Sequence, residues 1–421
     1  MKPMGDGEEV AIYSTVPAKR YYVCDRCIDD DTIKAFIVSE AEERCCDFCG
    51  RKSRTKEVAA PLDEVVEFMY QSINREYDRA VEVLGWDSAE GGYQGSHWDS
   101  YDLLTDGIGL SFPNDSDGRL LGIIADCLGD EPWCERHAYS LSEDEKLAYS
   151  WRHFCKLIKH ERRYFFLQQE EQEEPGFSEH LAPARLLRLI GDTVVGHGLI
   201  QTLPQGTLIY RARQQKPGEV LHSTYDLGPP LAEVATRSNR MSPAGIVMFY
   251  GSSEAETAIA EIDDDPAVGI VVGTFQLTKD VRVLDLTSLP ARVPFFQPDC
   301  SFDRYALNFL HDFVRDLRAK VEPGDREHVD YVPTQVVTEW FRSAFKHNDS
   351  RIDGIYYPSV QREGGRSIVL FADRGDLRLT DDEIENLAKA DSVEKWWLQT
   401  RQNEAWLQLV RVKPKRPPKG S

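Results

Sequence analysis

Two closely spaced cysteine pairs near the N-terminus constrain the fold of this chain more than any other feature. Cys24 and Cys27 form one C-x2-C pair, Cys46 and Cys49 form a second, and eighteen residues lie between the pairs. This spacing is typical of four-cysteine zinc sites, in which each pair directs two thiolates to one ion. Four thiolates close the coordination sphere, so we expect a structural zinc in a ribbon-like module of residues 1–58, not a catalytic metal.

Charge and composition limit what the rest of the chain can do. A chain of 421 residues is too long for a single domain with one hydrophobic core. Its apolar fraction of 41% is sufficient to form several cores. The net charge of −21 argues against nucleic-acid binding, because phosphate binding needs a basic surface. No apolar run is long enough to span a membrane and the first residues do not resemble a signal peptide, so we expect a cytoplasmic protein. In that reducing compartment, the nine cysteines indicate metal ligands or buried thiols more than disulfides. Cys45, next to Cys46, is expected to point away from the site, with a role as an alternative zinc ligand left open.

Residues 59–168 carry the apolar spacing of helices. From Pro61 to Gly85, apolar residues recur on one helical face at Val65, Met69, Ile73, Tyr77 and Leu84. A second helix is predicted from a capping box of Ser142 and Glu145, with a core face at Leu147, Trp151, Phe154 and Ile158. We therefore expect an all-α domain over 59–168, followed by an acidic linker over 169–184.

Strand and helix patterns alternate over residues 185–378. Segments rich in β-branched and aromatic residues predict strands at 207–213, 245–251, 268–277, 281–286, 354–360 and 366–372. Apolar periodicity predicts helices at 183–195, 253–262, 305–320 and 333–345. The glycine signatures of dinucleotide folds, P-loops and α/β-hydrolases do not occur, so a different mixed α/β domain is expected.

Polar residues stand at the ends of these strands in a distinctive order. Arg211 lies in LIYRAR, Arg240 precedes S-P-A-G, Tyr250 closes the next strand, Glu261 ends A-x-A-E, and Ser359 lies in Y-P-S-V. Together with Y-x-P-T-Q, this series resembles the RES family over roughly 205–375 of this chain. The sequence departs from the family in having Asn-Arg-Met where Gly-Arg-Trp or Gly-Arg-Phe is common. The cysteine pairs followed by helices are similar to the HEPN-related extension found before some RES domains.

The resemblance implies a fold akin to ADP-ribosyltransferases and cleavage of NAD⁺ between nicotinamide and ribose. Glu261 would then stabilise the oxocarbenium-like ribose or orient the attacking group. Arg211 and Arg240 would hold the pyrophosphate, Tyr250 would stack on a substrate ring, and Ser359 would bond the ribose or a phosphate. Residues of a second rank, expected to support these five, are Tyr210, Arg213, Thr334, Gln335 and Arg362.

Several functions stay open at this point. The main hypothesis is an NAD⁺-degrading toxin or defence effector that uses water or phosphate as the nucleophile. One alternative is transfer of ADP-ribose to a macromolecule, and another is a non-catalytic module that senses a nucleotide and binds a partner. RES domains are often paired with an antitoxin, so the resemblance implies control by such a regulatory protein or, in this chain, by its N-terminal parts.

Residues 379–421 are predicted to form a C-terminal helix and a basic tail. Thr380 and Glu383 form a capping box, and the following segment up to Val412 holds three tryptophans that we expect to be packed: Trp396, Trp397 and Trp406. Residues 411–421 are basic and rich in proline, and we expect them to be disordered. The whole chain is thus predicted to be an α+β multidomain protein.

Overall fold

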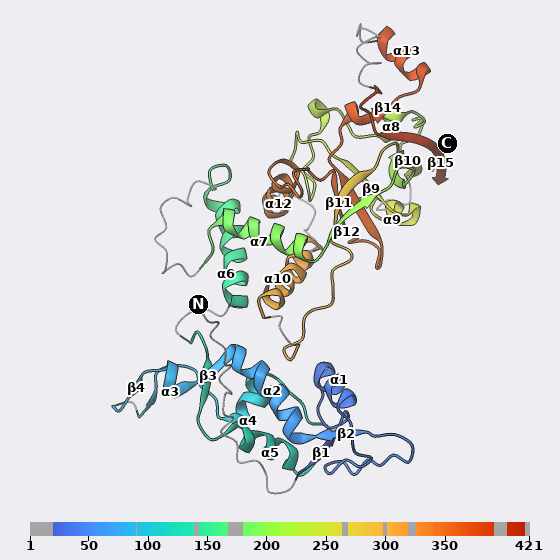
Figure 1. The fold of residues 1–421 in the computed structure, drawn as a ribbon. Helices are drawn as coiled ribbons and strands as arrows, with labels where there is room; N and C mark the ends of the chain where they lie inside the picture. The colour runs from blue at the N-terminus through green and yellow to red at the C-terminus, as the bar shows by residue number, and fades with distance from the viewer. Residues whose placement is uncertain are drawn as a thin grey trace, which may run out of the picture. The chain divides into compact units, whose positions relative to one another are not determined.

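The computed structural model describes residues 20–89, 91–138, 143–166, 180–262, 268–297, 301–318, 326–390 and 402–416. Contacts within the chain define two compact units (Figure 1). One unit comprises Met1–Lys146 with Arg292–Tyr305, and the other comprises Leu147–Ala291 with Ala306–Ser421. Among the described residues, no helix combines the length and the apolar character that a membrane crossing needs.

The first unit packs short helices against three two-stranded sheets. Its sheets are β1–β2, β3–β6 and β4–β5, and all three pairs are antiparallel. The strands are β1 (Tyr22–Cys24), β2 (Ala59–Pro61), β3 (Tyr77–Arg79), β4 (Trp86–Asp87), β5 (Gly92–Tyr93) and β6 (Trp133–Glu135). The helices are α1 (Asp31–Ser39), α2 (Leu62–Glu76), α3 (Ala80–Val83), α4 (Ser100–Asp102) with a π-helical turn at Leu103–Gly107, and α5 (Arg119–Leu128).

The core of the first unit forms around α2. Val65, Met69 and Ile73 are fully buried, as the apolar spacing predicts, and they belong to one cluster with Leu120 of α5. The same cluster contains Phe296, from the segment Arg292–Tyr305 that follows β11 in the chain. A distant stretch of sequence therefore completes this core.

The predicted helix over residues 61–85 is too long. Helix α2 ends at Glu76, and Tyr77 adopts an extended backbone that starts β3. Strand β3 pairs with β6, from Tyr77↔Glu135 to Arg79↔Trp133. Backbone pairing with this remote strand replaces the helix, although Tyr77 and Leu84 are both buried as expected.

A nine-stranded mixed sheet forms the centre of the second unit, in the order β14-β15-β10-β8-β9-β13-β12-β11-β7. All six predicted strands are present, and β7, β14 and β15 are additional. The strands are β7 (Ile200–Leu203), β8 (Leu208–Gln215), β9 (Phe249–Ser252), β10 (Gly269–Leu277), β11 (Val281–Asp285), β12 (Gly354–Pro358), β13 (Arg366–Leu370), β14 (Leu377–Arg378) and β15 (Leu407–Arg416).

The four helices predicted in this part of the chain are also present. They are α7 (Pro183–Gly196), α9 (Ala255–Ala260), α10 (Ser301–Arg318) and α12 (Val332–Ser343). Additional helices are α6 (Glu143–Lys156) with a π-helical turn at Leu157–Glu161, α8 (Thr224–Leu227), α11 (Glu327–Asp330), α13 (Asp381–Ala390), and 3-10 turns at Ala232–Val234 and Arg374–Asp376.

Helix α6, part of the predicted helical domain, belongs to the second unit by its contacts from Leu147 onward. Its predicted core face of Leu147, Trp151, Phe154 and Ile158 is buried. Nε1 of Trp151 donates to Asp316 of α10 at 2.8 Å. Ser142, the predicted cap, lies outside the described residues.

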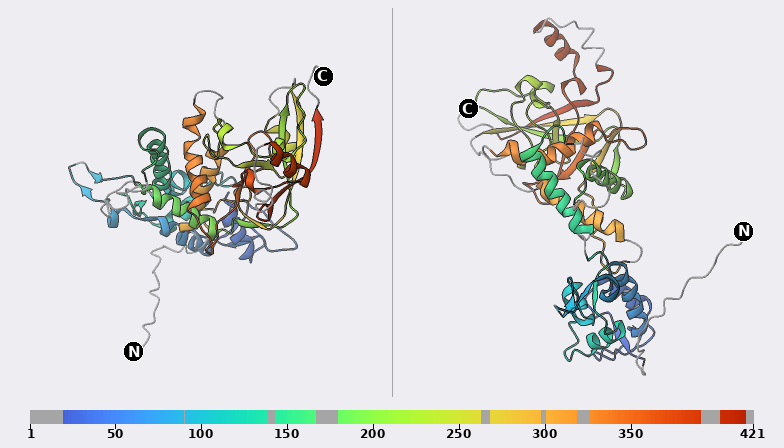
Figure 2. Two further views of the ribbon diagram at one scale, coloured as in Figure 1. Left: turned by 90° about the horizontal axis from the view of Figure 1, so that it is seen from above. Right: turned by 90° about the vertical axis from the view of Figure 1, so that its left-hand side faces the viewer.

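The prediction of a disordered tail from residue 411 is wrong as far as Arg416. Strand β15 pairs antiparallel with β10 from Leu277↔Leu407 to Ile270↔Arg416, and the two strands lie side by side in Figure 2. Without β15, the edge of β10 would carry unpaired backbone N–H and C=O groups. The backbone of a basic segment can hydrogen-bond to these groups as well as that of an apolar segment. The predicted helix is α13, which begins directly after Thr380, and Thr380 and Glu383 form the expected capping box. Trp406 is buried, as predicted. Trp396, Trp397 and residues 417–421 lie outside the described residues.

Candidate functional site

A pocket of about 950 Å³ opens in the second unit, at the junction of β8 and β9. These two strands pair only at Tyr210↔Ser252, so the ladder between them is otherwise open. The two backbones come close at this point. A Cβ atom on Gly251 would lie only 3.0 Å from the carbonyl oxygen of Tyr210, which explains why the position is a glycine. Four of the five predicted site residues line the pocket: Arg211, Arg240, Tyr250 and Glu261.

Two arginines of β8 bring positive charge to the pocket. Arg211 donates to the carbonyl of Tyr250 at 2.6 Å, and Arg213 donates to the carbonyl of Gly228. Among the described residues, neither forms an ion pair with a carboxylate, and the Nε atom of each is buried without a hydrogen-bond partner.

The electrostatics of this pair favour an anion. Burial, and then the neighbouring charge of Arg213, lower the pKa of Arg211 to about 9. Burial, and then Arg374, lower the pKa of Arg213. Both guanidinium groups stay protonated at neutral pH, and an anionic ligand would relieve their repulsion.

Arg240 lies on a loop that helix α12 holds in place. Its guanidinium donates to the carbonyl of Leu317 and lies over the ring of Tyr331, 5.3 Å from the ring centre. The side chain of Gln335 donates to the carbonyl of Asn239 at 2.7 Å, and Thr334 donates to the carbonyl of Arg240. Both second-rank residues of the Y-x-P-T-Q motif thus fix the backbone that carries Arg240.

Glu261 directly follows α9, at the C-terminal end of that helix. Its Oε1 atom accepts hydrogen bonds from Ser359 at 2.5 Å and from Ser367 at 3.1 Å. Ser359 in turn accepts from the backbone N–H groups of Gln361 and Arg362, at 3.3 and 3.1 Å. Among the described residues, Oε2 of Glu261 has no hydrogen-bond partner.

Two tyrosines, Tyr250 and Tyr357, line the pocket with this carboxylate. The hydroxyl of Tyr250 shares a 2.8 Å hydrogen bond with Ser242, and burial raises the pKa of Tyr250 to about 12. Burial, together with the charges of Tyr250 and Glu261, raises the pKa of Tyr357 well above its usual range. Both phenols therefore stay neutral at physiological pH.

The remaining second-rank residues lie around the pocket in supporting positions. Arg362 pairs with Glu254 and donates to Thr257 at 2.8 Å, which ties the loop after Ser359 to helix α9. Tyr210 packs with the apolar residues between α9 and the sheet. No motif marks Ser367, which lies inside a predicted strand, and no role is predicted from the sequence for Tyr357, the first residue of Y-P-S-V.

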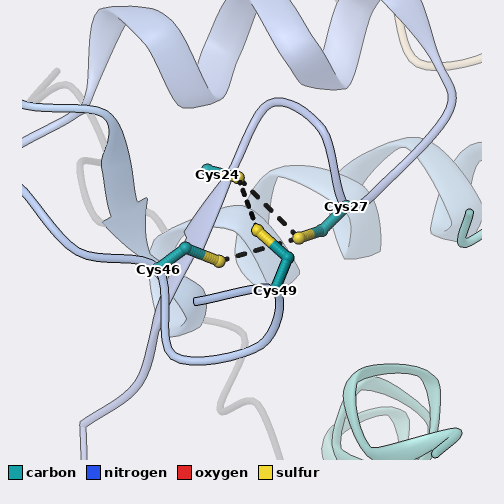
Figure 3. A group of neighbouring side chains, drawn as sticks. All are labelled: Cys24, Cys27, Cys46 and Cys49. Carbon is teal, nitrogen blue, oxygen red and sulfur yellow. Dashed lines mark hydrogen bonds between the residues drawn. The ribbon is translucent and has the colours of Figure 1, made fainter. Parts of the chain in front are cut away.

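The four predicted metal ligands come together in the first unit. The sulfur atoms of Cys24, Cys27, Cys46 and Cys49 all lie within 4.8 Å of one another (Figure 3). Individual sulfur–sulfur distances are 3.8, 3.5 and 3.6 Å. A tetrahedral ion with metal–sulfur bonds of about 2.3 Å requires sulfur atoms about 3.8 Å apart, so the arrangement fits such an ion. Cys45 is not a member of this group.

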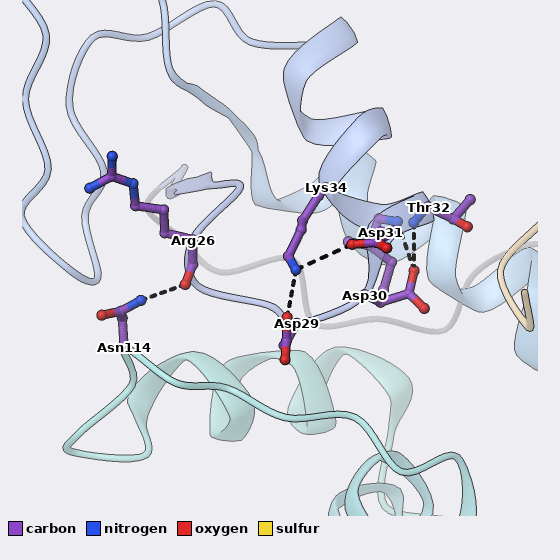
Figure 4. A network of polar contacts seen from close by, with 8 residues as sticks. Arg26, Asp29, Asp30, Asp31, Thr32, Lys34 and Asn114 are labelled. Atoms are coloured by element: carbon purple, nitrogen blue, oxygen red, sulfur yellow. Dashed lines mark hydrogen bonds and ion pairs between the residues drawn. The ribbon is translucent and has the colours of Figure 1, made fainter. Parts of the chain in front are cut away.

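Polar contacts around the first cysteine pair hold it against the rest of its unit (Figure 4). Asn114 donates to the carbonyl of Arg26, between Cys24 and Cys27, at 2.5 Å. Asp30 caps helix α1 by accepting from Thr32 and Ile33 at 2.9 Å. The cluster is therefore built into the fold, as a structural metal site requires.

Taken together, the mixed sheet, the pocket with its arginines and carboxylate, and the four-cysteine cluster define a two-unit α+β protein with a candidate site in its second unit. Family comparison then identifies two domains. Residues 208–390 match the RES domain family, and residues 39–172 match the HEPN/RES N-terminal domain 1. The chain thus carries a RES domain preceded by a HEPN/RES N-terminal domain. No curated protein and no solved structure matches the chain.

Proposed function

We propose that this chain cleaves the bond between nicotinamide and ribose in NAD⁺, with water or phosphate as the attacking group. The observation that carries the proposal is the pocket in which the carboxylate of Glu261, with Oε2 unbonded among the described residues, lies with Arg211 and Arg213, neither of which forms a direct ion pair there. Both features suit NAD⁺. The arginines match its pyrophosphate, which carries two negative charges, and the carboxylate matches its ribose, which becomes cationic as the bond breaks. The match to the RES domain family supports the same substrate.

The residues have distinct roles in this proposal. Arg211, Arg213 and Arg240 bind the pyrophosphate, and Tyr250 lies against a substrate ring. When the glycosidic bond breaks, its electron pair moves to the nicotinamide nitrogen, which leaves as a neutral base. Glu261 stabilises the positive charge on the ribose and orients the nucleophile, while Ser359 holds Oε1 of Glu261.

A matched pair of variants tests the role of Glu261. In Glu261→Gln the negative charge is lost while the size is kept, so we expect NAD⁺ cleavage to fall by about a hundredfold or more. Glu256→Gln removes a carboxylate from the exposed side of the same helix, and its rate should equal that of the wild type. Chromatography of NAD⁺ and nicotinamide gives both rates. Equal rates for Glu261→Gln and the wild type would remove Glu261 from the mechanism.

Two further parts of the proposal follow from the family. We infer that the sheet of the second unit is related to the ADP-ribosyltransferase fold, and that loss of NAD⁺ makes the chain a toxin or defence effector restrained by a regulatory protein. Expression of the wild type in a host cell should lower NAD⁺ and stop growth, and expression of Glu261→Gln should do neither.

We also propose that the four cysteines bind a structural zinc ion. Four thiolates favour zinc and leave no open coordination position, so the ion has no part in cleavage. Its role is to tie together the two cysteine pairs, which lie on either side of helix α1 in the chain.

A further inference from the structure

Ser367 lines the pocket and contacts Glu261, although no sequence motif marks it. It lies in β13, where it pairs with Tyr357 of β12 and Ser252 of β9, and only 1% of its surface is exposed. The next three residues, Ile368, Val369 and Leu370, are buried and apolar. A buried hydroxyl costs about 1–3 kcal/mol when it lacks a partner, so a serine here needs one.

The partner of Ser367 is the carboxylate of Glu261. Ser359, which directly follows β12, and Ser367 of β13 donate to the same oxygen, Oε1. The two bonds hold Oε1 in place, and they favour the carboxylate plane in which both lone pairs of that oxygen face the two donors. They also leave Oε2 as the oxygen available to the pocket.

We propose that Ser367 is a positioning residue that holds Glu261 so that Oε2 points to the reacting ribose. The inference rests on the proposed function, because it assigns Ser367 a role in the same reaction. Ser367 acts through Glu261 and does not itself bind NAD⁺. Its removal therefore lowers the rate of bond cleavage and leaves substrate affinity nearly unchanged.

Steady-state kinetics on the full chain test the catalytic part. A hydrogen bond to a charged group corresponds to about tenfold or more in rate, so Ser367→Ala should lower kcat by about tenfold, with KM changed by less than about twofold. The matched control is Ser253→Ala, because the Ser253 hydroxyl donates only to the carbonyl of Arg366, at 3.4 Å. An unchanged kcat in Ser367→Ala, or a fall shared by Ser253→Ala, would overturn the proposal.

A double-mutant cycle in thermal unfolding tests the contact itself, independently of activity. The melting temperatures of wild type, Ser367→Ala, Glu261→Ala and the double variant should be non-additive, because each single change leaves a polar group without its partner. Additive shifts would show that Ser367 does not hold Glu261. If the wild type leaves NAD⁺ intact, the proposed function fails, and this cycle still decides whether the two residues are coupled.

Discussion

At the scale of single residues, the pocket contains two desolvated cations that form no direct ion pair among the described residues, although Asp226 and Glu219 offset the charge of Arg213 in part. Arg211 and Arg213 lie on one strand, and each uses one hydrogen bond to a backbone carbonyl. A cation pair of this kind costs stability, because both charges are desolvated and repel each other. A bound anionic ligand would offset this loss of stability, because it attracts both guanidinium groups.

Replacing one of the two arginines tests this argument. Arg213→Met should weaken the binding of ADP-ribose by about tenfold or more, because one charged hydrogen-bond donor is lost. The ligand-free variant should melt no lower than the wild type, because the repulsion with Arg211 is gone. Calorimetric titration and thermal unfolding measure the two quantities. Arg378→Met, at an exposed position of β14, is the control, and equal affinity in both variants would contradict the role of Arg213.

At the scale of elements, sequence periodicity was a good guide where an element buries one face. The helices α6 and α2 bury the predicted residues, and the six predicted strands all occur. Periodicity failed where a partner distant in sequence decides the structure. Tyr77 leaves the helical conformation to pair with Glu135, and residues 407–416 become a strand because β10 lies beside them.

The candidate site could be predicted only in part for the same reason. Motifs in family order pointed to Arg211, Arg240, Tyr250, Glu261 and Ser359, and the structure places all five at or beside one pocket. No motif in the sequence points to Ser367, because its contact with Glu261 depends on the pairing of β13 with β12. The roles of these residues stay predictions.

The attachment of β15 can be tested at its tryptophan. Trp406 is buried, and its Nε1 atom donates to Asp376 at 2.9 Å, just before β15 begins. Trp406→Ala should lower the free energy of unfolding by about 3–5 kcal/mol, as for other large buried aromatic residues. Val410→Ala, at an exposed position of β15, should change it by less than about 0.5 kcal/mol. Denaturant unfolding measures both, and similar small effects would mean that Trp406 does not hold the strand.

At the scale of the whole molecule, the segment Arg292–Tyr305 complicates any separation of the two units. Phe296 is fully buried in the core of the first unit, although the chain on both sides belongs to the second. A fragment of residues 185–421 would expose this apolar segment. Control by the N-terminal parts, which the sequence raises as a hypothesis, is therefore better tested in the full chain.

The assignment of the four metal ligands can also be tested in the full chain. The wild type should contain about one zinc ion per chain, and Cys46→Ser should lose it because three thiolates remain. Cys45→Ser should keep the ion, since Cys45 lies outside the group of four. Atomic absorption measures zinc, and thermal unfolding should show a lower melting temperature for Cys46→Ser alone. Loss of zinc in Cys45→Ser would contradict the assignment of ligands.

The central claim is that this chain breaks the nicotinamide–ribose bond, and product analysis tests it most directly. Purified full-length protein is incubated with NAD⁺, with and without phosphate, and the products are separated by chromatography. The account predicts free nicotinamide together with ADP-ribose, or with its 1″-phosphate when phosphate is the nucleophile. NAD⁺ that remains intact under both conditions would contradict the claim and favour a module that binds the nucleotide without cleaving it.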